Sequence, residues 1–238
     1  MTRTLLIIKT GNTIPSLRQQ GEDFEDWFIA QSGYPVEAFT VRSLFLGEPL
    51  PDLADTAGII VTGSPAYVTD LEPWNDIAAG YLRDAHEREV PVLGVCYGHQ
   101  LLAWAFGGDV GFHPAGREIG SVAVHTTDAA SDDRLFAALP AQFTAQVSHQ
   151  QSVLGLPQGA ILLASNDFDP HHAFRLGQTS WGVQFHPEFN AGITRAYITA
   201  RQDDLRAEGL PVEHLLQSAR PSPESAALLR RFCALALE

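Results

Sequence analysis

The fold of this chain is decided by one stretch of sequence, VPVLGVCYGHQ at residues 90–100. Its apolar first half predicts a short buried strand, and the run LLAWAF at residues 101–106 predicts a helix. Between them lies the spacing Gly94-x-Cys96-x-Gly98, typical of a tight strand-to-helix turn that lifts one side chain above the end of a sheet. The two glycines leave room where larger side chains would collide. We therefore predict that Cys96 is a reactive thiol, held as thiolate by the helix N-terminus that follows.

Length and composition limit the class of protein. The chain has 238 residues, of which 45% are hydrophobic, so it can form one large α/β domain over residues 1–238. Its formal net charge of −13 would repel a phosphate backbone, and no basic cluster offsets this charge. We therefore expect no nucleic-acid partner.

The chain carries no recognisable targeting or membrane signal. Residues 1–9 are too short for the apolar core of a signal peptide, and no run approaches the roughly 18 apolar residues that a membrane span needs. Two cysteines, Cys96 and Cys233, do not make a disulfide framework. A cytoplasmic location, where a thiol stays reduced, is therefore expected. Cys233 lies in a helical pattern near the C-terminus and is expected to be a core residue.

Apolar strands alternate with helical patterns through the first half of the chain. This alternation predicts an α/β fold with a mostly parallel central sheet and helices on both faces. Strands are expected at residues 5–8, 36–41, 58–61 and 92–95, and helices at residues 16–31 and 74–85.

The second half of the chain has a different sequence pattern, in which short predicted strands are separated by turn residues. Strands are expected at residues 122–125, 143–147, 161–164, 173–176 and 181–185. Such a run predicts a smaller antiparallel or mixed sheet. Residues from about 190 to 238 return to helical patterns. We expect this C-terminal extension to cover the domain, with docking of a second copy in a homodimer as the open alternative.

A cysteine nucleophile needs a base within hydrogen-bond reach and a group that orients the base. His186 directly follows the predicted strand at residues 181–185, so it is expected at the same edge of the sheet as Cys96. Glu188, two residues later, can fold back on the imidazole and hold one ring nitrogen protonated. We predict that Cys96, His186 and Glu188 form a catalytic triad.

Attack of a thiolate on an acyl carbon also requires N–H donors for the oxyanion. The backbone N–H of Tyr97 comes from the turn itself. A second donor is expected from the neighbouring strand end, at Gly63 and Ser64.

These motifs together resemble the class I glutamine amidotransferases, which use a cysteine triad, and in particular the amidotransferase domain of GMP synthase. The matching segments, in family order, are residues 61–65, 72–74, 91–100, 116–120, 148–150 and 184–188. The resemblance implies the flavodoxin-like fold of that family. It also implies that Cys96 attacks the side-chain amide of glutamine, that a γ-glutamyl thioester forms with release of ammonia, and that water then releases glutamate.

The resemblance implies further roles, residue by residue. Gly63, Ser64 and Tyr97 correspond to the oxyanion hole. Gln100 corresponds to a residue that contacts the substrate. Ser148, His149 and Gln150 correspond to the segment that grips the α-amino and α-carboxylate ends of the substrate.

Two positions depart from the pattern of GMP synthase. Ser64 replaces a glycine of the oxyanion segment, and Gln150 replaces the glycine of the usual Ser-His-Gly motif. Both changes add bulk near the substrate and leave the triad intact.

Several functions remain open at this point. No Gly-x-x-x-x-Gly-Lys-Ser/Thr motif for ATP is present, so ammonia would pass to a separate synthetase, such as a GMP synthase-type partner. One alternative is a γ-glutamyl hydrolase or peptidase that acts on larger γ-glutamyl amides. Another is a regulatory subunit without catalytic activity. The order of the triad disfavours a cysteine α/β-hydrolase, because its acid normally precedes the histidine in the chain.

No cofactor or metal is expected. The adjacent pair His171 and His172, with His149 or His186, is the one candidate for a metal site. Adjacent residues on a strand point to opposite faces, so both rings would not easily bind one ion.

Overall fold

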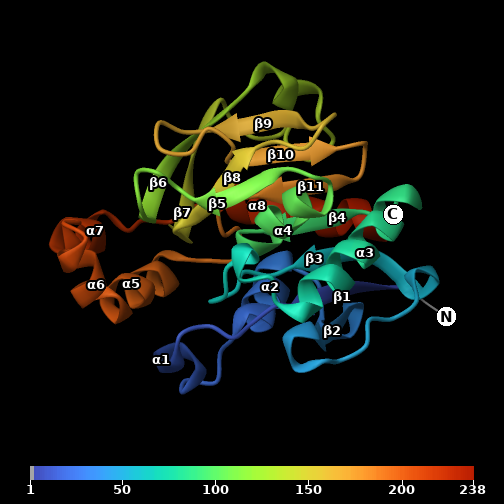
Figure 1. Ribbon diagram of the computed structural model, residues 1–238, viewed down its shortest axis with the longest axis horizontal. Coiled ribbons are helices and arrows are strands. Elements are labelled where there is room, and N and C mark those ends of the chain that lie inside the picture. The colour runs from blue at the N-terminus through green and yellow to red at the C-terminus, as the bar shows by residue number, and fades with distance from the viewer. Residues whose placement is uncertain (1–2) are drawn as a thin grey trace.

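Five short apolar runs pair as parallel strands at the centre of the molecule (Figure 1). They are β1 (Thr4–Lys9), β2 (Phe39–Ser43), β3 (Thr56–Val61), β4 (Val92–Val95) and β11 (Ser180–Val183). Their order is β2-β1-β3-β4-β11, and each is parallel to its neighbour. All but the edge strand β2 are buried along almost their whole length, so helices must cover both faces of the sheet.

Helices from both ends of the chain provide this cover. They are α2 (Phe24–Ser32) and α8 (Pro223–Leu237) on one face, and α3 (Pro73–Glu87) and α4 (Tyr97–Ala105) on the other. The side chains of β1 alternate between the faces: Leu5 packs in the cluster that contains Phe28 of α2, and Leu6 in the cluster that contains Leu82 of α3.

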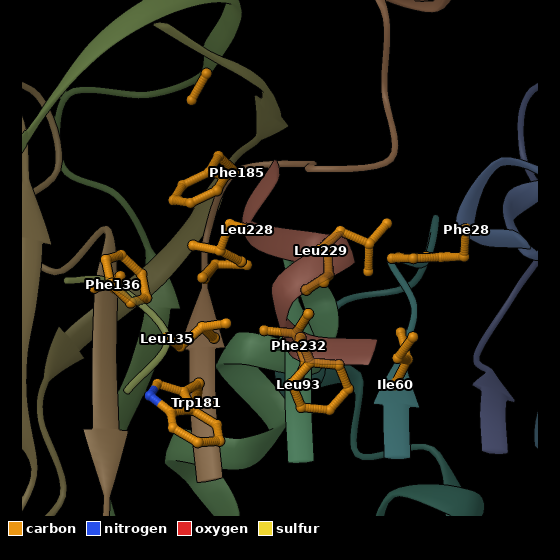
Figure 2. Close-up of a cluster of buried hydrophobic side chains, with 14 of the residues drawn as sticks. Phe28, Ile60, Leu93, Leu135, Phe136, Trp181, Phe185, Leu228, Leu229 and Phe232 are labelled. Carbon is orange, nitrogen blue, oxygen red and sulfur yellow. The ribbon is translucent and has the colours of Figure 1, made fainter. Parts of the chain in front are cut away.

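Helix α8 presents an apolar stripe to the sheet. Leu228, Leu229 and Phe232 project from it towards Leu93 of β4 and Ile60 of β3 (Figure 2). Burial of these side chains contributes about 1.5–3 kcal/mol each. The C-terminal end of the chain is thereby part of the main core.

Beyond β11 the strands of the sheet are antiparallel, as predicted from the short strands and frequent turn residues of the second half of the chain. The further strands of the sheet are β10 (Ala173–Leu176), β9 (Ile161–Ser165), β6 (Glu118–Thr126) and β7 (Gln142–His149). A separate two-stranded sheet consists of β5 (Asp109–Phe112) and β8 (Gln151–Gly155). The computed structural model describes residues 3–238, and within them the large sheet has nine strands. The predicted fold class, a mostly parallel α/β sheet with a smaller second sheet, is confirmed.

Four shorter α-helices are also present among the described residues. They are α1 (Pro15–Arg18), α5 (Ala191–Ala200), α6 (Gln202–Ala207) and α7 (Val212–Ser218). Helices α5, α6 and α7 lie together beside the ends of β6 and β7 (Figure 1). Ile198 and Leu205 pack there against Ile119 of β6.

The continuous helix expected at residues 16–31 is wrong, because the chain breaks between α1 and α2. Gly21 has a φ of +83° there. Asp23 then starts α2 with a capping box, and its carboxylate also accepts from the Thr13 N–H at 2.7 Å. Asp23 and Glu25 both pair with the buried Lys9 ammonium, each at 2.8 Å. These bonds favour a new helix start over continuation.

The strand expected at residues 36–41 is displaced. Val36–Ala38 forms a 3₁₀ turn after Pro35, and β2 begins only at Phe39. The strand expected at residues 181–185 ends at Val183, so its last two residues belong to the loop that carries His186.

Among residues 3–238, every helix falls short of the length and apolar character that crossing a lipid bilayer requires.

Candidate active site

Cys96 lies on the sharp turn between β4 and α4. Its backbone has φ 51° and ψ −101°, a conformation that L-residues rarely adopt. The two flanking glycines are required sterically: a Cβ on Gly94 would lie 2.3 Å from the carbonyl oxygen of Gly98, and one on Gly98 would lie 2.4 Å from that of Val61. The strained nucleophile turn predicted from the sequence is therefore present.

The register of the parallel strands gathers distant segments at one edge of the sheet. Val61 of β3 pairs with Gly94 of β4, and Gly94 pairs with Gly182 of β11. Because all three strands run in the same direction, the residues that follow them meet at their carboxyl ends. The sheet therefore brings together Cys96 and His186, which are 90 residues apart in the sequence.

His186 is held by three groups. Its Nδ1 lies 2.7 Å from Oε1 of Glu188, and its backbone N–H donates to the carbonyl of Gln146 at 2.8 Å. The ring of Phe189 stacks on the imidazole with the centroids 4.0 Å apart. Since an ionised carboxylate only accepts hydrogen bonds, Nδ1 carries the proton and Nε2 is available to Cys96.

The electrostatics favour an ion pair between sulfur and imidazole. Burial opposes ionisation of Cys96, but the positive charge of the nearby His186 outweighs it, so the pKa of the thiol lies below its ordinary value. Burial likewise opposes protonation of His186, but the charges of Glu188 and Cys96 outweigh it and raise the pKa of the imidazole. A thiolate facing an imidazolium is the reactive form of a cysteine nucleophile.

The loop after β3 lies directly against the imidazole. A Cβ on Gly63 would come within 3.0 Å of Cε1 of His186, which leaves little room for a larger residue. The hydroxyl of Ser64 donates to the carbonyl of Thr10 at 2.7 Å, and that of Thr10 donates to the carbonyl of Gly63 at 3.0 Å. The serine that replaces the family glycine is thus used to fasten this loop.

Two backbone N–H groups beside Cys96 are free. Across the described residues 3–238, neither the N–H of Ser64 nor that of Tyr97 donates to a protein acceptor. Both residues line the cavity that contains Cys96. The arrangement can therefore accommodate a developing oxyanion.

Cys96 lies between two adjoining cavities. The small cavity has a volume of about 60 Å³ and includes Tyr97, Gln100 and Gln150 in its lining. The large cavity has a volume of about 380 Å³ and includes Phe24, His186 and Tyr197. Cys96, Ser64, Pro65, Ser148 and Arg201 line both.

The structure brings all four predicted substrate-binding residues to the small cavity. The carbonyl of Ser148 lies 4.0 Å from the sulfur of Cys96. Gln100 donates from Nε2 to the carbonyl of Gln151 at 2.7 Å. The side chain of Gln150 is hydrogen-bonded to Tyr67 and, at 3.4 Å, to Glu208.

His149 has both ring nitrogens engaged away from the cavity. Nδ1 lies 3.0 Å from the carbonyl of Gln151, and Nε2 lies 2.9 Å from Oε2 of Glu118. Any contact of His149 with a ligand in the small cavity would therefore involve its backbone.

Glu118, His149 and His172 form a buried cluster whose ligand atoms lie within 4.8 Å of one another, close enough to hold a metal ion. Hydrogen bonds account for the same geometry. Oε2 of Glu118 accepts from His149 and from His172 at 3.2 Å, while Oε1 accepts from Asn166 at 2.6 Å. Burial disfavours the carboxylate, but these bonds and the two rings outweigh it and lower the pKa of Glu118.

The pair of histidines singled out from the sequence does not act together. Both residues precede β10 in a turn and are not on a strand, contrary to the expectation. Nδ1 of His171 lies 2.6 Å from the carbonyl of Val153, whereas His172 points to Glu118.

Sequence reasoning missed several residues around Cys96. Tyr67 and Arg117 line the small cavity, and Tyr197 and Arg201 line the large one. Arg201 lies immediately after α5, where the sequence offered only a helical pattern. Arg201 follows Tyr197 by about one helical turn, so the two residues lie on the same side of the helix. This spacing is the signal in the sequence that could have identified Arg201.

Comparison with known proteins agrees with this geometry. The family model "Glutamine amidotransferase class-I" matches residues 29–202. The chain is 39% identical over 139 residues to a glutamine-hydrolysing GMP synthase of Porphyromonas gingivalis, covering 58% of this chain and 26% of that protein. It thus spans about a quarter of the length of that relative. It is also 36% identical over 141 residues to one subunit of the glutamine-hydrolysing GMP synthase of Archaeoglobus fulgidus, covering 59% of this chain and 70% of that relative.

Solved structures have the same fold. A glutamine amidotransferase of Thermotoga maritima superposes with a TM-score of 0.79 at 23% identity, covering 100% of this chain and 99% of the other. A glutamine amidotransferase of Methylobacillus flagellatus superposes with a TM-score of 0.75 at 23% identity, covering 99% of this chain and 93% of the other.

Proposed function

The chain belongs to the class I glutamine amidotransferase family, and from this premise we propose that it hydrolyses the side-chain amide of glutamine to glutamate and ammonia. The observation that carries the proposal is the placement of Cys96 on a strained turn beside His186, which is itself bonded to Glu188. This arrangement supplies a nucleophile, a proton carrier and an orienting acid.

In the proposed reaction, the Cys96 thiolate attacks the amide carbon and forms a tetrahedral oxyanion. The free N–H groups of Ser64 and Tyr97 would stabilise this oxyanion. His186 then transfers a proton to the departing nitrogen, the carbon–nitrogen bond breaks, and a γ-glutamyl thioester remains on the sulfur. His186 next removes a proton from water, which attacks the thioester and releases glutamate.

The proposed binding mode places the γ-glutamyl part of the substrate in the small cavity. Gln100, Ser148, His149 and Gln150 would contact it there, since all four line that cavity. For His149 we propose a backbone contact, because its ring nitrogens are already bonded. The departing nitrogen would face the large cavity, which is the one that His186 lines.

Ammonia released in this way would pass to a synthetase on another chain. Support comes from the relatives that are named as single subunits of a GMP synthase, because the match covers about 70% of their own length. We also propose that residues 1–238 act as one domain with a helical extension from about residue 190, because α8 contributes Phe232 to the same core as Leu93.

The experiment combines labelling with two variants. A glutamine-like electrophile, 6-diazo-5-oxo-norleucine, should label Cys96 stoichiometrically and leave Cys233 unlabelled, since burial raises the pKa of Cys233 to about 12. Cys96→Ala and His186→Ala should each lose glutaminase activity. His125→Ala, which changes an exposed histidine of β6, serves as the matched control.

A Cys96→Ala protein with near wild-type hydrolysis would contradict the mechanism. If instead the wild type hydrolysed nothing and Cys96→Ala kept the full biological role, the alternative of a regulatory subunit without catalytic activity would be favoured.

A further inference from the structure

The large cavity exceeds what the release of ammonia requires. A cavity needs a volume of about 10–15 Å³ to hold a molecule of the size of water. The large cavity offers about 380 Å³ and opens directly onto Cys96 and His186. In the proposed binding mode the departing nitrogen faces this cavity, because His186 lines it, so the cavity can hold a substituent on that nitrogen.

The lining of the large cavity combines apolar and polar groups. Ile14, Pro15 and Phe24 provide apolar surface near its wall. Thr13 and Tyr197 are hydrogen-bonded to each other through their hydroxyls at 2.7 Å, which fixes the position of the tyrosine. This mixture of apolar and polar groups suits a short organic substituent better than an inorganic ion from the solvent.

Arg201 supplies a positive charge at the junction of the two cavities. Its guanidinium carbon lies 5.3 Å from the centroid of the Tyr197 ring, which supports it by a cation–π contact. Throughout the described residues 3–238, no carboxylate lies within ion-pair distance of Arg201, and its side chain has no hydrogen-bond partner. The charge is therefore available to a ligand.

Arg117, the other arginine beside Cys96, is not available in this way. It donates two hydrogen bonds of 2.9 Å to the carboxylate of Glu208. Arg117, and to a lesser degree Arg201, lowers the pKa of Glu208. Glu208 is thus bound to Arg117, and Arg201 remains without an anion.

Most arginines among residues 3–238, such as Arg88 and Arg230, also lack an ion pair, so the informative feature of Arg201 is its position. Arg201 lines both cavities beside Cys96. A charged group that stays unpaired beside a nucleophile is typical of a recognition site for the opposite charge.

From these observations we propose that the same site also cleaves γ-glutamyl amides whose leaving amine carries a carboxylate, such as γ-glutamyl amino acids, and that Arg201 binds this carboxylate in the large cavity. The inference rests on the proposed thiol chemistry. The Cys96 sulfur bonds to the γ-carbonyl carbon, the carbon–nitrogen bond breaks, and His186 protonates the amine. The amino acid leaves, and water hydrolyses the thioester to glutamate.

Three substrates test this proposal: glutamine, γ-glutamylglycine and γ-glutamylglycinamide. The last two have nearly the same shape and differ by one charge. We expect wild-type kcat/KM to be higher for γ-glutamylglycine than for γ-glutamylglycinamide. Arg201→Gln should lower kcat/KM for γ-glutamylglycine by about 10- to 100-fold, mainly through KM, as expected for one charge-assisted hydrogen-bonded pair. It should leave γ-glutamylglycinamide nearly unchanged.

Arg206→Gln is the matched control, because it removes the same charge from an exposed position on the neighbouring helix α6. Arg201→Lys should recover part of the loss. The comparison of γ-glutamylglycine with γ-glutamylglycinamide needs only the wild type, so it stands even if Arg201→Gln does not fold.

The outcomes separate the two proposals. If glutamine is hydrolysed best and the glycine and glycinamide derivatives react equally, the inference is overturned and the large cavity is an exit path for ammonia, while the proposed function stands. If none of the three substrates reacts and Cys96 takes no label, both proposals fail.

Discussion

Substitution of Gly98 tests whether the proposed reaction at Cys96 depends on the exact geometry of the turn, because it changes that geometry and leaves Cys96, His186 and Glu188 in place. A Cβ at this position would lie 2.4 Å from the carbonyl oxygen of Val61, whereas ordinary contact begins at 3.4 Å. Because real Cβ contacts do not fall below 3.0 Å, the start of α4 must move away from β3 in Gly98→Ala, and reaching ordinary contact requires a movement of about 1 Å. Tyr97 and Cys96 would move with it, while His186 stays on the loop after β11.

A misplacement of about 1 Å at a catalytic group can cost about 100-fold in rate. We expect Gly98→Ala to lower kcat/KM for glutamine by about this factor, with a parallel loss in the labelling rate of Cys96. Overpacking costs about 1–3 kcal/mol, offset by about 1 kcal/mol from the higher helix propensity of alanine. At about 2–4 °C per kcal/mol for a domain of this size, the variant should remain folded at 25 °C.

Gly80→Ala provides the matched control. Gly80 is also helical, in α3, and the nearest atom to an added Cβ is the end of the Arg83 side chain at 4.0 Å. This variant should keep wild-type kinetics with unchanged or slightly higher thermal stability. Gly98→Ala kinetics within about threefold of wild type, in a protein with an unchanged melting temperature, would refute the argument from strain.

Two further predictions concern the buried ion pairs. Glu188→Gln removes the charge that raises the pKa of His186, so this pKa should fall; the alkaline limb of the pH profile of kcat/KM for glutamine should then move to lower pH, and an unmoved limb would disprove the role of Glu188. Glu118→Gln should lower the free energy of unfolding at pH 7 by about 1–3 kcal/mol, because one amide oxygen cannot accept all the hydrogen bonds that His149, His172 and Asn166 donate to the carboxylate. In the wild type, the pKa of Glu118 is lower in the folded state than its unfolded value of about 4.3. The difference in the free energy of unfolding between wild type and variant, measured with urea, should therefore shrink as the pH falls below about 5. A difference that does not depend on pH would contradict the role given to the Glu118 carboxylate.

Local backbone sterics explain why so much of the site could be predicted. The turn at Cys96 needs glycines at fixed spacing, and its two flanking positions, Gly94 and Gly98, are visible in seven residues of sequence. The proximity of His186 to Glu188 is similarly local, since only Pro187 lies between them in the sequence. Alternation of apolar strands with helices was sufficient for the parallel half of the sheet.

Predictions were weaker where distant bonds compete with local propensity. The break before α2 depends on Asp23, whose carboxylate is drawn to Lys9 on β1 and to the N–H of Thr13. No helical periodicity in residues 16–31 signals these partners. The strand at Phe39 begins late for a comparable reason, because it is paired from Leu5 of β1 onward.

The sequence by itself determined the strained thiol, its imidazole and acid, and the class of fold, because each is encoded by spacing within a few residues or by a repeated pattern. Only the tertiary structure decided which groups surround that thiol. The pairing of β11 with β4 and the two cavities arise from contacts between segments that are distant in the sequence, and the place of Arg201 at these cavities depends on the same packing. Such contacts depend on how whole layers pack, and short-range sterics do not specify them.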